Sequence, residues 1–194
     1  MIEAKFVASD DLVTQLFEET ISIRDFLLKN GEASYSSSVD NTFRKVLLLA
    51  VASKFELQLT ESVQRFVSEV VTAEHPIYHI VERKAVKRQY HAWFEWEGRN
   101  ANKFFSLFGD RFKTFMAEKV KADPFLDDGI QSFLELGNDR NLLVHGNFAN
   151  VVINKTSLEI FASYQRALPF VEAINSYLNE FCGAMLDFAS RSRD

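Results

Sequence analysis

Three polar side chains of types that act on phosphodiesters lie close together in the chain: Arg140, Asn141 and His145. An imidazole can transfer a proton at neutral pH. A guanidinium can bind a phosphate through paired hydrogen bonds and stabilise the charge that develops on it. The carboxamide of Asn141 can orient either group. These residues predict a metal-free phosphodiester cleavage, with Arg140 on the phosphate and His145 as general acid or base.

The segment has the pattern of a helix that ends at a glycine, because Gly146 is typical of the position after a helix C-terminus. At ~100° per residue, Asn141 and His145 lie within about 40° of each other on a helix, whereas Arg140 and His145 are about 140° apart. One helix therefore does not bring the Arg and His head groups together. The alternative that these residues only cap the helix end stays open.

The order Arg140, Asn141, three further residues, His145 and Gly146 resembles the R-N-x-x-x-H signature of the HEPN superfamily, particularly the group of RiboL-PSP-associated HEPN proteins. Other segments also resemble that group. One is a Leu-rich helix that carries Ser53 and Glu56, and the others are an Asn-x-x-Lys-Phe-Phe segment at 100–105 and Leu-Phe-Gly at 107–109. The resemblance covers roughly residues 10–185 and implies an all-helical domain.

The resemblance also implies a function. It implies a metal-independent endoribonuclease without a cofactor, in which 2′-OH attack on RNA leaves a 2′,3′-cyclic phosphate. Such proteins act as toxins or defence effectors, and a cognate antitoxin protein often inhibits them. Some members have lost catalysis and serve as RNA-binding or protein-interaction modules, and that alternative stays open. So does a helical regulatory subunit whose acidic surface meets a basic partner.

The family also implies a homodimer whose shared cleft joins the Arg and His of both protomers. The wide angle between Arg140 and His145 on one helix agrees with this, because a two-fold axis beside that helix would set four groups around one cleft. The interface would be isologous. We expect Leu143, Val144 and Phe148 near its seam.

Ser53 and Glu56 lie three residues apart on one side of the expected second helix. In this fold such a polar pair can approach the Arg–His site, so Glu56 is a candidate for orienting Arg140. The alternative is a surface carboxylate beside Lys54 with no catalytic role.

The net charge is −5, which argues against bulk nucleic-acid binding. Basic residues nevertheless gather in one expected helix over residues 77–96, where Arg83, Lys84, Lys87 and Arg88 recur at steps that share one broad face. This face is the candidate RNA-binding surface. A solvated helix face is the competing interpretation, and we assign the interleaved aromatic residues Trp93 and Phe94 to the core.

Length and composition predict one globular domain over residues 1–194, with a core of about 10–189. Cys182 is the single cysteine, which excludes an intrachain disulfide and agrees with a reducing cytoplasm. We expect no targeting segment, and no apolar run approaches the ~20 residues that span a bilayer. Pro76 separates His75 from His79, so we expect no metal site there.

The apolar spacing, with only 7 Gly and 3 Pro, predicts an all-α bundle of five to seven helices. The expected helices are residues 10–30, 40–59, 61–73, 77–96 and 111–122, a motif helix that begins near 127 or 128, and a last helix to about 189. Residues 1–9 form a lead-in, residues 34–38 a polar connection, residues 151–153 an extended connector or hairpin arm, and residues 191–194 a frayed tail.

Polar residues mark several of these helix ends. Thr60 and Asp110 are expected N-caps, Asp127 or Asp128 caps the motif helix, and residues 156–159 form a capping box. Pro169 should kink or split the last helix.

Overall fold

The computed structural model describes residues 11–146 and 148–191, and the chain is all-α in this part. The seven α-helices are α1 (Leu12–Lys29), α2 (Ala33–Val70), α3 (Pro76–Ile80), α4 (Asn102–Ser106), α5 (Asp110–Ala122), α6 (Pro124–His145) and α7 (Ser157–Arg191). A π-helical segment, η1 (Val81–Val86), and a 3-10 turn, η2 (Tyr90–Ala92), follow α3. The predicted all-α bundle is confirmed. The predictions for residues 1–9 and 192–194 lie outside the described residues.

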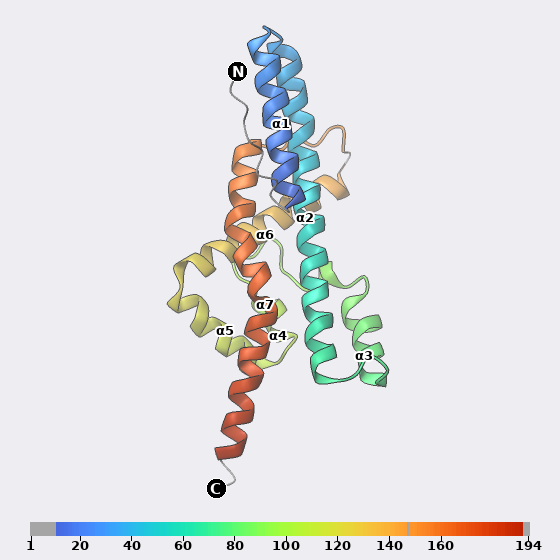
Figure 1. The fold of residues 1–194 in the computed structure, drawn as a ribbon, viewed down its shortest axis with the longest axis vertical. Coiled ribbons are helices and arrows are strands. Elements are labelled where there is room, and N and C mark those ends of the chain that lie inside the picture. Colours follow the sequence, from blue (N-terminus) through green and yellow to red (C-terminus); the bar gives the residue numbers. More distant parts are fainter. Residues whose placement is uncertain (1–10, 147, 192–194) are drawn as a thin grey trace.

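The two longest helices, α2 and α7, run side by side in the same direction along the long axis of the molecule (Figure 1). The first helix, α1, folds back along the N-terminal half of α2, and α6 packs against both α7 and α2. Apolar residues at four-residue spacing fill the centre of α2, and each is at most 1% exposed: Leu47, Val51, Phe55 and Leu59. The expectation that this helix lies in the middle of the bundle is confirmed.

One polar cluster ties α1, α2 and α7 together. Asp11 caps α1 by accepting from the Val13 backbone N–H (3.1 Å), and it also accepts from Lys54 Nζ (2.7 Å) and the Tyr164 hydroxyl (2.5 Å). Burial alone would raise the pKa of Asp11. The hydrogen bonds from Lys54 and Tyr164, with smaller ones from Thr14 and Val13, outweigh burial and lower this pKa to about 2.

The prediction of two helices over residues 40–73 is wrong, because α2 is continuous from Ala33 to Val70. The Thr60 hydroxyl donates to the carbonyls of Glu56 (2.8 Å) and Leu57 (2.9 Å), so it bonds within the helix instead of capping a new one. The prediction of a polar connection at residues 34–38 is also wrong, because these residues belong to the first turns of α2. Ser36 in this segment is buried, and its hydroxyl donates to the Arg24 carbonyl. The turn before it comes at Gly31, with φ +80°, as expected.

The prediction of one helix over residues 77–96 is wrong as well. The chain leaves the helical conformation at Lys87, and Arg88 has a left-handed φ of 63°. The chain therefore turns back, and the Trp93 indole N–H donates to the Ala85 carbonyl (2.9 Å). Trp93 and Phe94 are buried, which confirms their assignment to the core.

Two further helix starts differ from expectation. Gly109, with φ +95°, precedes α5, so Asp110 is its first residue and not its N-cap. Asp123 caps α6, because its Oδ1 accepts from the backbone N–H of Phe125 (2.9 Å) and Leu126 (3.3 Å). Capping by Asp127 or Asp128 is therefore wrong.

The capping box at the start of α7 is confirmed. The Thr156 backbone N–H donates to Glu159 Oε2 (2.7 Å), and the Glu159 N–H donates back to Thr156 Oγ1 (3.2 Å). The helix continues through Pro169, so the chain is not split there. Residues 148–156 form a connector without a strand, which is the first of the two predicted alternatives.

None of the helices in the described part of the chain combines the length and the apolar character that crossing a membrane requires.

Candidate functional site

The C-terminal half of α6 carries the motif. Leu136 and Leu143 on it are buried, Arg140 and Asn141 are half-buried, and His145 is exposed. His145 is the last helical residue, and the Gly146 backbone N–H donates to the Leu142 carbonyl (3.0 Å). The predicted helix end at this glycine is confirmed.

Arg140 contacts an amide oxygen and an imidazole nitrogen. Its Nη1 donates to Asn141 Oδ1 (3.2 Å) and lies 3.5 Å from Nδ1 of His91. Among the described residues, no carboxylate oxygen lies within 4.0 Å of its guanidinium nitrogens, whereas Arg44 pairs with Asp40 and Lys155 with Asp139. The charge of Arg140 is thus available to a bound anion.

His91 is the site residue that sequence reasoning missed. It lies in η2, and its Nε2 is 4.0 Å from Oε2 of Glu56. Burial, and then the positive charge of Arg140, lower the pKa of His91; Glu56 acts in the opposite direction, and His145 lowers it further. Arg140 and His145 therefore both lower the pKa of the His91 imidazole, although the two side chains leave the helix in different directions.

Trp96 holds His91 against α6. Its indole N–H donates to the His91 carbonyl (3.0 Å), and its ring packs over Gly137, one turn before Arg140. A Cβ at Gly137 would lie 2.0 Å from Trp96 Cζ3, so only glycine permits this approach. The adjacent Tyr90 is buried among aromatic rings, and this burial raises its pKa.

Glu56 lines the same small hollow as Arg140 and Asn141, above the rings of Phe55 and Phe133. The ionisable side chain that lies 4.0 Å from its carboxylate is His91 and not Arg140. The structure therefore places Glu56 beside the predicted site, but next to a different residue from the one that we expected.

Ser53 is exposed and lies in another groove of about 470 Å³, which Glu56, Lys87 and Arg88 also line. It does not line the hollow at Arg140. The basic residues do not share one helical face, because the helix ends between them. Arg83 and Lys84 lie in η1, whereas Lys87 and Arg88 follow it.

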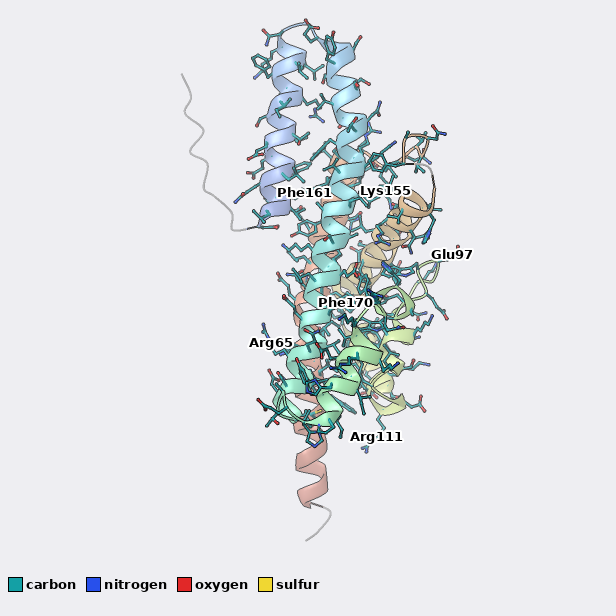
Figure 2. All side chains as sticks on the ribbon, turned by 90° about the vertical axis from the view of Figure 1, so that its right-hand side faces the viewer. Arg65, Glu97, Arg111, Lys155, Phe161 and Phe170 are labelled. Atoms are coloured by element: carbon teal, nitrogen blue, oxygen red, sulfur yellow. The ribbon has the colours of Figure 1, made fainter. Side chains whose placement is uncertain are left out.

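A larger open groove of about 910 Å³ begins at Asn141 and continues past Leu142 and His145. Its opposite wall comes from the loop before α4, including Trp96 and Glu97, and Figure 2 shows Glu97 beside this end of α6. Grooves of this size hold small-molecule or nucleotide-sized ligands. Asn141 lines both the groove and the hollow, so the two adjoin at the motif.

The connector after the motif is fastened on both sides. Lys155 Nζ donates to Asp139 Oδ2 (2.7 Å) and Glu135 Oε2 (3.2 Å) on α6. Lys45 Nζ on α2 donates to the Phe148 carbonyl (2.7 Å). Asp139, although it lies within the motif segment, is thus engaged in holding the connector.

No group of three His, Cys, Asp or Glu side chains within residues 11–146 and 148–191 is arranged to hold a metal ion. His75 accepts the Ile77 backbone N–H through Nδ1 (3.1 Å), so it caps α3.

Comparison with known proteins gave one family. A family model described as RiboL-PSP-HEPN matches residues 14–180, which include all of the site residues above. Searches of curated proteins and of solved structures gave no match.

Proposed function

Because the chain belongs to the RiboL-PSP-HEPN family, we propose that it is a metal-independent endoribonuclease. The observation that supports this most is that the Arg140 guanidinium, which has no carboxylate partner among the described residues, lines a hollow that adjoins the groove at His145. Asn141 lines both the hollow and the groove. A phosphate-binding cation next to an imidazole is the minimum that metal-free phosphodiester cleavage requires.

In this proposal Arg140 binds the scissile phosphate and stabilises the charge of the transition state. Asn141 orients Arg140 through its Oδ1. His145 transfers a proton as general acid or base. The ribose 2′-OH attacks phosphorus, the bond from phosphorus to the 5′ oxygen breaks, and the products are a 2′,3′-cyclic phosphate and a 5′-hydroxyl. No cofactor takes part.

We assign RNA contacts outside the site to Lys87 and Arg88, whose groove adjoins Glu56 and hence the hollow at Arg140. Arg83 and Lys84 are exposed beside them and extend the basic surface. Such contacts would hold phosphates without reading sequence.

The proposal includes a homodimer. Leu142, Val144 and Phe148 are exposed around the motif, by 60%, 48% and 46%, and a second copy of the chain could cover them. Leu143 is 1% exposed and packs in its own core, so its predicted place at the seam is wrong and Leu142 takes it.

The test is an RNA digestion in excess chelator, followed by mapping of the product ends. Cleavage that leaves 2′,3′-cyclic phosphate and 5′-hydroxyl ends supports the proposal. Cleavage that requires Mg²⁺ or Mn²⁺ would replace it with a metal-dependent mechanism. RNA binding without cleavage would identify a non-catalytic module. Growth arrest on expression, relieved by His145→Ala, would support the role of a toxin. The proposal further assigns such a toxin to the cytoplasm, under the control of a cognate antitoxin.

A further inference from the structure

We propose that His91 and Glu56 are the general-base pair of this reaction: His91 removes the proton of the attacking 2′-OH, and Glu56 orients His91. The inference rests on the proposed ribonuclease function. It adds two residues from outside the motif and leaves His145 the role of general acid.

The position of His91 supports this assignment. Its Nδ1 is 3.5 Å from Nη1 of Arg140, so a phosphate on that guanidinium brings the neighbouring ribose next to the imidazole. Its Nε2 is 4.0 Å from Oε2 of Glu56. With the ring proton on Nε2, towards the carboxylate, Nδ1 keeps its lone pair on the side of Arg140. The Nε2–Oε2 gap exceeds a hydrogen bond, and such gaps commonly shorten when substrate binds.

The charges that face His91 come from two helices and favour the same role. Arg140 and His145 on α6, together with burial, disfavour protonation of the ring, and Glu56 on α2 favours it. The lowered pKa favours the neutral ring, which is the form that a base requires. When it takes a proton, Glu56 stabilises the imidazolium, as the carboxylate does in other carboxylate–histidine pairs. Tyr90, beside His91, stays uncharged because burial raises its pKa.

Both side chains are accessible and well placed. His91 and Glu56 side chains are 46% and 41% exposed, so substrate can reach the imidazole. The backbone of His91 is fixed by the Trp96 indole, which itself packs on Gly137 of α6. An ordinary surface histidine would have no such link to the motif helix.

The proton balance of the step closes with two histidines. The 2′-OH gives its proton to Nδ1 of His91 as its oxygen bonds to phosphorus. The bond from phosphorus to the 5′ oxygen breaks, and that oxygen takes a proton from His145. His91 then releases its proton to water and His145 regains one.

The test separates base from acid by the leaving group. Two substrates are compared: an RNA, and the same RNA with sulfur in place of the bridging 5′ oxygen at its mapped cleavage site. A thiolate leaves without a proton, so His145→Ala should recover on the sulfur substrate. His91→Ala should lose at least ~10²-fold on both substrates, since the 2′-OH must still be deprotonated.

The matched control is His79→Ala. The His79 side chain is similarly exposed, and its Nδ1 lies 3.7 Å from Oε2 of Glu82. The two residues form an imidazole–carboxylate pair that does not include Arg140. We expect parent rates from it. His91→Gln, checked by circular dichroism, guards against a folding defect in His91→Ala.

A second measurement needs no cleavage. In an NMR titration of the histidine rings, Glu56→Gln should lower the pKa of His91, because Glu56 favours the imidazolium. If the pKa of His91 is unchanged in Glu56→Gln, the proposed pairing of His91 with Glu56 is wrong. Full activity of His91→Ala beside an inactive His145→Ala would overturn this inference and leave the ribonuclease standing. A parent that cleaves neither substrate would overturn both.

Discussion

Arg140 is the residue on which the proposed chemistry most depends. Its Nη1 donates to Asn141 Oδ1 and lies 3.5 Å from His91 Nδ1, and neither partner is a carboxylate. A bound phosphate can replace these contacts without first breaking an ion pair. Lys155, by contrast, is held by two carboxylates and is committed to the fold. The same kind of charge therefore has a structural use at one position and is free for a ligand at the other.

Asp11 gives a prediction on stability. Asp11→Asn should lower the free energy of unfolding near pH 7 by about 2 kcal/mol, because it removes the carboxylate charge that accepts the hydrogen bonds from Lys54 and Tyr164. Urea denaturation measures this. Asp25→Asn, at an exposed carboxylate, is the control and should change it by less than about 0.5 kcal/mol.

The effect of Asp11 should also depend on pH. Its pKa is about 2 in the folded protein and 3.8 unperturbed, so its stabilisation is complete above about pH 4 and is lost as the pH falls towards 2. The difference between parent and Asp11→Asn should therefore shrink over that interval. A difference that stays constant down to pH 2 would contradict the ionised role of Asp11.

At the scale of elements, α6 is positioned by an aromatic layer. Phe133 on α6 lies 5.7 Å from Phe55 of α2 and 4.8 Å from Phe94, centroid to centroid. Trp96 covers Gly137 one turn later. The polar motif thus lies beside tightly packed aromatic rings. This packing keeps Arg140, His91 and Glu56 at fixed distances from one another.

Gly137→Ala should disturb this layer. The added Cβ would overlap the Trp96 ring, which must move and take the His91 backbone with it. We expect a loss of about 1–3 kcal/mol in unfolding free energy and a fall in cleavage rate. The control is Gly183→Ala in α7, where an added Cβ meets nothing within 4 Å. Equal behaviour of the two variants would show that Trp96 does not need this contact.

The basic groove gives a prediction on binding. Charge reversal at Lys87 and Arg88 should weaken RNA binding and flatten its salt dependence, by about one unit of slope for each phosphate that the protein no longer neutralises. Lys29→Glu combined with Arg111→Glu makes the same charge change outside this groove. If both double variants have the parent slope, Lys87 and Arg88 belong to a solvated surface.

Sequence patterns predicted the helices better than their ends. Leu47 to Leu59 repeat with helical spacing, so α2 was recognisable, but Thr60 reads as a cap although its hydroxyl bonds inside the helix. The motif helix and its end at Gly146 followed from residue types. His91 could not be found in this way, because its contact with Arg140 spans 49 residues and depends on the chain reversal at Arg88.

At the scale of the whole molecule, the exposed apolar residues near the motif matter most. Leu142 lines the groove that contains His145, and Val144 and Phe148 are exposed nearby in the chain. A two-fold axis there would cover them and bring two copies of His145 to one cleft.

A homodimer has a functional consequence. We expect light scattering to give twice the monomer mass, and mixing inactive Arg140→Ala with inactive His145→Ala to restore partial activity in heterodimers. Val144→Asp should shift the protein towards monomer and lower the activity, whereas Val152→Asp, at an exposed valine in the connector, is the control. A monomer that cleaves RNA at the parent rate would show that each chain has a complete site.

The central claim is that Arg140 and His145 cleave RNA without a metal. Its most direct test is the initial cleavage rate of one RNA in excess EDTA by the parent, Arg140→Ala, His145→Ala and the His79→Ala control. We predict that the parent and the control cleave at equal rates, while the other two lose at least ~10²-fold and keep the parent circular dichroism spectrum. A His145→Ala protein that cleaves as fast as the parent would contradict the account.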